Sequence, residues 1–307
     1  MAALDPRLLA PRERGVELVR ADDLGGLWSL RLPLAYPRTR SVNVFLLDRH
    51  TLLDCGSAVG LGLDGLEHAL RMAGGRLEDI RTLVLSHLHA DHASLAGELV
   101  ERTGCELLRF EGPDTNIDFL REPTIDRAER ARVARRHGVP EEALEVMIDT
   151  PLADDGLQPR PPADAFLRAG DTVAGWEVVD ATGHSPNQLA LWDGTRVLGA
   201  DAAYAGMAPY LEWGHTPDPI AEYLATLERL EALGARRFLA SHGAPDDDPP
   251  ARYAAAREAV AEMVRRVEAG GEGSAWELTR RLTGDTADPE PRQTWISRVL
   301  CVTRGKR

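Results

Sequence analysis

The segment H-L-H-A-D-H at residues 87–92 brings together three of the chain's nine histidines and an aspartate within six positions. It directly follows the apolar run 82–86, so these polar side chains stand where a buried strand would end. Neutral imidazoles and a carboxylate suit zinc or iron, and an H-x-H pair on a tight turn can direct two rings at one ion. A polar loop with coincidental histidines is the alternative, but it would rarely produce the whole pattern. The segment therefore predicts a metal site.

Three more residues of metal-binding type, His184, Asp201 and His242, each stand just after a later apolar run. Those runs are 176–181, 196–200 and 237–241. Loops at the ends of strands are where binding and catalytic side chains concentrate. Taken singly, each residue could equally be a turn histidine or a capping aspartate. Together with the histidine segment they are further candidate ligands for a metal ion.

Short apolar or alternating runs predict the strands that must position these residues. The predicted strands are 16–21, 27–32, 42–48, 51–55, 82–86, 105–110, 176–181, 189–193, 196–200 and 237–241, with a hairpin turn at 48–50. Apolar side chains at three- and four-residue spacing predict helices over 61–73, 93–103 and 218–233, the last with a stripe of Ile220, Leu224, Leu227 and Leu230. Two strand-rich halves with helices outside them favour two sheets covered by helices on both faces.

The remaining segments are of three kinds. Residues 114–149 are charged with helical spacing and predict a helical insertion, whereas the proline- and aspartate-rich tract 154–165 predicts a loop. After residue 250 the spacing becomes helical, with 274–282 as a further short helix. The predicted buried face of this tail consists of Tyr253, Val260, Val264 and Val267. We therefore expect a main domain over 1–248 and a helical appendage over 249–307.

Composition limits the function classes. The formal net charge of −13 without a Lys/Arg block argues against nucleic acid as a partner. No apolar run is long enough for a bilayer, and the first residues lack the features of a signal peptide. The three cysteines are far apart and form no C-x-x-C pair, so neither disulfides nor a zinc knuckle is expected. We expect a cytoplasmic protein that binds neither nucleic acid nor membrane.

Over about residues 16–245 the sequence resembles the metallo-β-lactamase superfamily of hydrolases. The resemblance rests on H-L-H-A-D-H, on the histidines of G-H-S and S-H-G, on Asp201, and on L-L-D-C-G at 52–56, which is similar to the family's early turn beneath the metal site. It implies an α/β (α+β) chain folded as a four-layer αββα sandwich. Two departures, H-A-S-L-A-G and G-H-S-P-N-Q, change the surroundings of the site and remove no ligand.

The same resemblance implies two divalent ions, with zinc expected and iron or manganese as alternatives. One ion would take His87, His89 and His184, the second would take Asp91, His92 and His242, and Asp201 would bridge them. A metal-bound hydroxide would then be the nucleophile, so that no serine or cysteine is needed. Asp91 would also act catalytically by hydrogen bonding that hydroxide.

Tyr204, three residues after Asp201, has the spacing of the quorum-sensing lactonase branch, where such a tyrosine contacts the substrate carbonyl. Packing in the pocket wall is the alternative. Trp213 and His215 on the following segment are expected to line the pocket. The insertion 114–149 is expected to act as a lid, with a surface or dimer-forming helix pair as the alternative. The tail resembles the small winged-helix-like appendage of some bacterial members.

The leading function is hydrolysis of an acyl bond, in a thioester, ester or lactone, of a small or carrier-linked metabolite. A phosphodiesterase or ribonuclease uses the same pair of ions, and a mononuclear-iron persulfide dioxygenase is a second alternative within the superfamily. A non-catalytic binding module would lack a ligand, whereas all seven ligand positions are filled. A homodimer is compatible with the sequence.

Overall fold

The structure is a computed structural model, and it describes residues 19–34, 39–113, 126–149, 161–204, 207–284 and 290–304. The chain divides into two compact units. The first contains residues 1–111, 153–178 and 240–245, and the second contains 112–152, 179–239 and 246–307. Parts of the predicted strand 16–21, of the insertion and of the loop 154–165 lie outside the described residues.

The first unit is built on a seven-stranded sheet whose strands follow in chain order from β1 to β7. The strands are β1 (Arg20–Asp23), β2 (Trp28–Pro33), β3 (Ser41–Leu46), β4 (Thr51–Leu53), β5 (Thr82–Leu85), β6 (Glu106–Phe110) and β7 (Ala165–Leu167). Pairing is antiparallel from β1 to β4 and parallel from β4 to β7. The parallel part brings the carboxyl ends of β4 and β5 to the same edge, which is where ligand-binding loops of such sheets gather.

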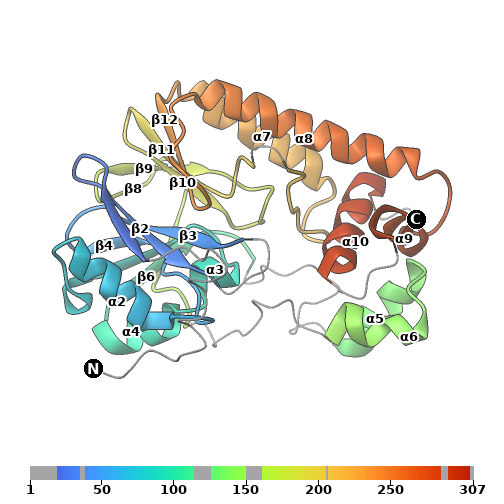
Figure 1. The fold of residues 1–307 in the computed structure, drawn as a ribbon, viewed down its shortest axis with the longest axis horizontal. Helices are drawn as coiled ribbons and strands as arrows, with labels where there is room; N and C mark the ends of the chain where they lie inside the picture. The colour runs from blue at the N-terminus through green and yellow to red at the C-terminus, as the bar shows by residue number, and fades with distance from the viewer. Residues whose placement is uncertain are drawn as a thin grey trace, which may run out of the picture. The chain divides into compact units, whose positions relative to one another are not determined.

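Helices of the first unit close one core with this sheet. They are α2 (Gly62–Met72), η2 (Leu77–Asp79), α3 (Ala90–Ala93) and α4 (Ala96–Thr103). The apolar stripe of α2, including Leu66 and Leu70, packs with β2, while α4 packs with β6. Both helices are visible with the sheet in Figure 1. This core holds the strand ends that carry the histidine segment.

The second sheet has five strands in the order β12, β11, β10, β9, β8. Their bounds are β8 (Thr172–Val173), β9 (Trp176–Asp180), β10 (Leu189–Trp192), β11 (Arg196–Ala200) and β12 (Arg237–Ala240). The hairpins β8–β9 and β10–β11 are antiparallel. His184 follows β9, Asp201 follows β11, and His242 follows β12, so each lies just beyond a strand, as the sequence predicts.

The second unit is rich in helices. They are α5 (Arg127–Arg136), α6 (Glu141–Leu144), the π-helical turn η3 (Glu145–Asp149), α7 (Pro219–Ala232), α8 (Pro249–Ala269), α9 (Ala275–Thr283) and α10 (Glu290–Thr303). Asp218 and Asp248 cap α7 and α8, each followed by a proline, which lacks the N–H that a helix start leaves unbonded. Helices α7 and α8 lie side by side, and α10 packs against α7, α8 and α9.

Several expectations about elements need correction. The short strands β7 and β8 were not predicted, because neither has the length or alternation that marks a strand. The histidine segment is not wholly a turn, since Asp91 and His92 lie in the helical turn α3. On α7 the buried face includes Tyr223 and Thr226, while Ile220 and Leu224 are only half-buried. On α8, Met263 is buried in place of Val264.

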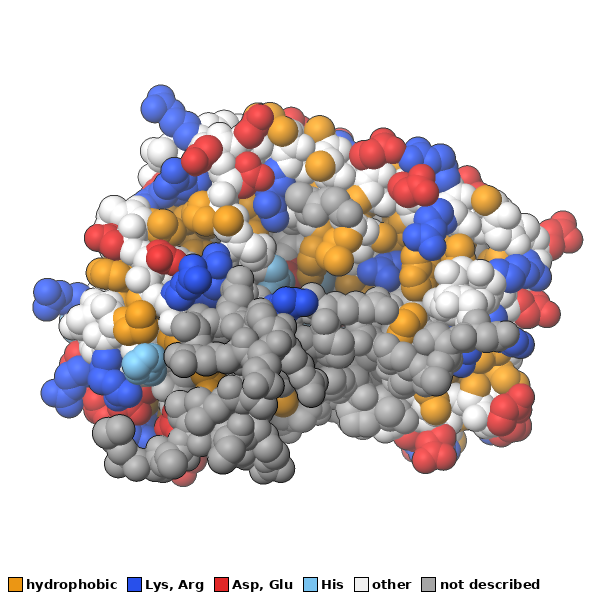
Figure 2. All heavy atoms as spheres, viewed as in Figure 1, with side chains coloured by type: hydrophobic (Ala, Val, Ile, Leu, Met, Phe, Trp, Pro, Cys, Tyr) orange, Lys and Arg blue, Asp and Glu red, His pale blue; other side chains and the backbone are white. Residues whose placement is uncertain are grey.

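Two further observations concern membrane-spanning helices and the charges on the surface. Among the described residues, no helix has the length and apolar character required to cross a membrane. On the face drawn in Figure 2, acidic and basic side chains are interspersed over the described surface.

Candidate metal centre

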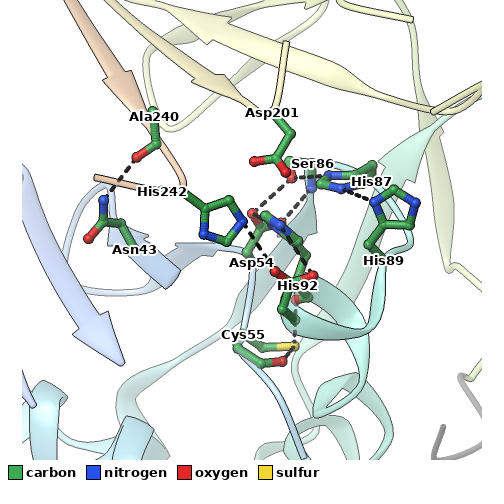
Figure 3. Close-up of polar contacts among 12 residues, drawn as sticks. Asn43, Asp54, Cys55, Ser86, His87, His89, His92, Asp201, Ala240 and His242 are labelled. Atoms are coloured by element: carbon green, nitrogen blue, oxygen red, sulfur yellow. Dashed lines mark hydrogen bonds and ion pairs between the residues drawn. The ribbon is translucent and has the colours of Figure 1, made fainter. Parts of the chain in front are cut away.

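Asp54 organises the histidine segment in the first unit. It directly follows β4, is fully buried, and has φ 66°, a left-handed conformation that aspartate tolerates better than most residues. Its carboxylate accepts hydrogen bonds from the Ser86 amide (2.7 Å), the Ser86 hydroxyl (2.8 Å) and His92 Nδ1 (2.8 Å). The parallel pairing of β4 with β5 makes this possible, because it places Asp54 beside Ser86. Figure 3 shows this network.

His87 and His89 continue the network. His87 Nδ1 donates to the Ser86 hydroxyl at 3.0 Å, since that hydroxyl itself donates to Asp54. The opposite nitrogen, His87 Nε2, lies 2.9 Å from His89 Nδ1. The carbonyl of His89 accepts hydrogen bonds from the amides of His92 and Ala93. These two bonds begin the helical turn α3. The predicted H-x-H pair therefore directs two ring nitrogens to one place.

His242 and Asp91 form the other part of this unit's centre. His242 Nδ1 donates to the Ser41 carbonyl at 2.8 Å, and its Nε2 lies 3.2 Å from an Asp91 carboxylate oxygen. The second Asp91 oxygen lies 3.6 Å from His92 Nε2. The ligand atoms of Asp91, His92 and His242 all lie within 4.8 Å of one another, a spacing that suits a shared ion.

Asn43 ties the segment that carries His242 to β3. Its side-chain amide donates to the carbonyls of Ala240 and Gly243, both at 2.9 Å, and its backbone amide donates to Ser241 at 2.7 Å. Asn43 is labelled with Ala240 and His242 in Figure 3. Sequence analysis missed Asn43, because a polar residue inside an apolar strand does not indicate which distant loop it binds.

Cys55 also lies beside this centre but is unsuited to nucleophilic chemistry. Its thiol is buried and donates to the His92 carbonyl at 3.1 Å. Burial, followed by the neighbouring Asp54 carboxylate, raises the pKa of this thiol well above its ordinary value. The protonated thiol is a weak nucleophile, so Cys55 is unsuited to attack a substrate.

In the second unit, His184 lies on a loop pressed closely against α7. Gly183 has φ 126°, and a Cβ atom there would lie 2.5 Å from Tyr223 Cα, so only glycine allows this approach. His184 Nδ1 donates to the Tyr210 carbonyl at 2.7 Å. Its Nε2 lies 3.7 Å from an Asp201 oxygen. The helix and the loop carbonyl thus orient the ring toward Asp201.

Tyr204 contacts Asp201 directly. Its hydroxyl donates to an Asp201 carboxylate oxygen, and its backbone amide donates to the Tyr223 hydroxyl at 3.2 Å. Tyr223 is fully buried, and this burial raises the pKa of its phenol. The phenol of Tyr204 therefore lies next to a candidate metal ligand, and its contact with a substrate remains a prediction.

Trp213 and His215 contact other residues of the second unit. The Trp213 ring meets the ring of His137, which follows α5, edge to face with centroids 5.3 Å apart. His215 Nε2 lies 3.8 Å from the carboxylate of buried Glu212. Part of the predicted insertion therefore packs beside the segment that was expected to line the pocket. The roles of both residues in substrate binding remain predictions.

The donor set suits a divalent transition-metal ion. His92, His242 and His184 each have Nδ1 bonded to a carboxylate or carbonyl oxygen, and His87 bonds a hydroxyl. In the first three, Nε2 is directed toward a carboxylate oxygen. Metal-binding histidines characteristically use one nitrogen for such an outer hydrogen bond, which leaves the other as the ligand atom. The rings of His87, His92, His184 and His242 are therefore oriented as those of metal-binding histidines are.

A family model described as the metallo-β-lactamase superfamily matches residues 37–242, a span that contains all seven candidate ligands. The chain belongs to the metallo-β-lactamase superfamily. It is 27% identical over 239 residues to the Bacillus subtilis (strain 168) protein named "Probable metallo-hydrolase YqjP", covering 71% of each chain. This membership confirms the predicted family and fold class.

Two solved structures extend the comparison. A metallo-β-lactamase family protein of Thermus thermophilus is 27% identical, with a TM-score of 0.73 over 92% of this chain and 93% of that one. A β-lactamase domain protein of Burkholderia ambifaria shares the fold at 22% identity, with a TM-score of 0.69 over 92% of this chain and 86% of that one. The superfamily member described here is a metal-dependent hydrolase with a candidate His/Asp site for divalent metal.

Proposed function

We propose that the chain hydrolyses an acyl bond of a small or carrier-linked metabolite at a site that holds two divalent ions, with zinc as the resident metal. His87, His89 and His184 would hold one ion, and Asp91, His92 and His242 the other. Asp201 would contact both. The proposal is supported by the outer hydrogen bonds that orient the histidines of each unit and by superfamily membership.

When bound, a pair of divalent ions polarises the bond to be cleaved and lowers the pKa of water, so that water can attack near neutral pH. The protein's own residues then orient the reactants. Asp91 can accept a hydrogen bond from the attacking water while its two oxygens face His92 and His242. The hydrogen bonds of the Ser86 amide and hydroxyl to the Asp54 carboxylate hold the start of the histidine segment in place.

The hydrogen bond from Tyr204 to Asp201 is the observation that supports an acyl substrate. The phenol hydroxyl of Tyr204 donates to Asp201, so it lies beside a candidate metal ligand. A phenol at this position can donate to a departing alkoxide, which gains negative charge during acyl transfer. A thiolate leaving group gains little, because it is already stable near neutral pH. This argument favours a lactone or ester over a thioester.

The test combines metal analysis with a substrate panel of an acyl-homoserine lactone, an acyl thioester, a nitrophenyl ester and bis-nitrophenyl phosphate. We expect two zinc ions per chain and hydrolysis of the lactone or ester. Tyr204→Phe should slow lactone hydrolysis by tens- to several-hundred-fold, roughly the cost of one oriented donor, and should hardly change thioester hydrolysis.

His89→Ala is the control for the metal and should lose metal and activity together. Full activity of the metal-free protein, or of this variant, would overturn the proposal. Turnover of the phosphate diester alone would favour the phosphodiesterase alternative. A single iron with oxygen uptake on a persulfide would favour the dioxygenase.

A further inference from the structure

We propose that the C-terminal helix α10 positions His184 through the backbone of residues 208–211, which makes Ser297 and Arg298 positioning residues of the metal site. The inference rests on the proposed function in one respect, namely that His184 is a metal ligand. All of the contacts that support it lie within the second unit.

The first step is the dependence of His184 on one backbone carbonyl. His184 Nδ1 donates to Tyr210 at 2.7 Å, and the ring itself is almost fully buried. Gly183 leaves no room for the loop to move toward α7, because a single added Cβ would already meet the backbone of Tyr223. The Tyr210 carbonyl is therefore one of the contacts that set the direction of the His184 ring.

The second step is that α10 holds the carbonyls on both sides of Tyr210. Arg298 donates from Nε to the Pro209 carbonyl at 3.0 Å and from its terminal nitrogen to the Ala208 carbonyl at 2.9 Å. Ser297 donates its hydroxyl to the Leu211 carbonyl at 2.8 Å. Residues 208–211 are therefore bonded to consecutive positions of one helix, with the Tyr210 carbonyl bonded to His184.

The third step is that the hydrogen bonds of Ser297 and Arg298 are not easily replaced by water or by another side chain. Ser297 is fully buried, where water cannot replace a lost hydrogen bond. The planar guanidinium of Arg298 spans two consecutive carbonyls, a geometry that a lysine ammonium does not reproduce. Helix α10 in turn packs against α7, the helix that presses on Gly183. Two helices that pack together, α7 and α10, therefore limit the His184 loop from one side and orient its ring from the other.

The experiment uses the metal-free full-length chain titrated with Co²⁺, whose visible absorption reports coordination directly. Affinity is measured by competition with a chromophoric chelator. Ser297→Ala, Arg298→Lys and the double variant are compared with Gln293→Ala. Gln293 is a matched control on α10, because it is buried and donates at 2.8 Å to the Val146 carbonyl of η3, a different backbone segment from residues 208–211.

We expect the double variant to weaken Co²⁺ binding about three- to tenfold and to change the visible spectrum, somewhat less than the loss typical of a direct outer-shell partner. Each single variant should show a smaller change of the same kind. Gln293→Ala should leave both affinity and spectrum unaltered, although its thermal unfolding temperature falls. Equal changes in Gln293→Ala and the double variant, or no change in either, would overturn the inference.

His184→Ala separates this inference from the proposed function. A loss of part of the Co²⁺ absorption in His184→Ala supports the ligand assignment. If that loss occurs while Ser297→Ala and Arg298→Lys match wild type, only the role of α10 fails. If His184→Ala keeps the full wild-type spectrum, the ligand assignment fails and the role of α10 fails with it.

Discussion

The histidine segment of the first unit and His184 of the second unit are held by different kinds of neighbour, whereas His242 of the first unit bonds the Ser41 carbonyl. In the first unit, one buried carboxylate, Asp54, accepts bonds from Ser86 and His92. In the second unit, His184 is held by the carbonyl of Tyr210, and Asp201 accepts the hydroxyl of Tyr204. The first arrangement depends on a charged side chain, whereas the second depends largely on where loops and helices place the backbone. Substitutions should therefore affect the two units differently.

The largest expected effect is the loss of activity in Asp201→Ala. Asp201 is buried, but Tyr204, whose hydroxyl it accepts, is only half-buried, so water can replace the lost hydrogen bond and the metal-free variant should unfold within about 1 kcal/mol of wild type. Because the carboxylate is proposed to contact both ions, kcat/KM should fall roughly a thousandfold, about 4 kcal/mol of transition-state stabilisation. Steady-state kinetics and urea unfolding measure the two quantities. Normal turnover with the metals in place would show that Asp201 is not a shared ligand.

Asp54→Ala should give the largest loss of stability. The substitution leaves buried donors from Ser86 and His92 without their acceptor and places alanine at φ 66°. We expect the free energy of unfolding to fall by about 3 kcal/mol or more in the metal-free protein. Asp54→Asn, which keeps an acceptor oxygen, is the matched control and should lose less. Equal losses in the two variants would mean that the hydrogen bonds contribute little.

Gly183→Ala should have an intermediate effect, in the second unit. The new Cβ would meet the backbone of Tyr223 at 2.5 Å, so either the loop or α7 must move. The control is Gly194→Ala, which also has a positive φ of 90° but has no atom within 4 Å of the new Cβ. Backbone strain alone costs about 1 kcal/mol, and the clash should add roughly 1 kcal/mol or more. Urea unfolding measures the difference, and equal midpoints for Gly183→Ala and Gly194→Ala would rule out the clash with α7.

Ser86→Ala should have the smallest effect and sharpens the comparison within the first unit. It removes one donor to Asp54 and the acceptor for His87, while the Ser86 amide and His92 still bond the carboxylate. We expect a loss of about 1 kcal/mol in urea unfolding and weaker metal binding through His87. A loss as large as that of Asp54→Ala would mean that the hydroxyl, rather than the carboxylate, organises the segment.

Much of the fold was predictable because its signals are local. The strands from β2 to β6 and from β9 to β12, and the helices α2 and α7, follow from apolar runs and periodicity. The short strands β7 and β8 could not be found this way, since a strand of two or three residues is defined by its partner and not by its own pattern. The buried face of α7 includes Tyr223 and Thr226, which the predicted apolar stripe did not contain. These residues are buried because the helix packs closely on the His184 loop.

The candidate ligands themselves were determined by the sequence alone, because a metal site needs particular donor atoms and H-L-H-A-D-H places four of them on one short segment. The tertiary structure decided what orients those donors. Ser41 and Tyr210 act through their carbonyls, and every residue has a carbonyl, so no residue type could mark them. The same is true of the 208–211 backbone held by Ser297 and Arg298. Such partners are fixed by which distant backbone segments meet, and that depends on the packing of each unit as a whole.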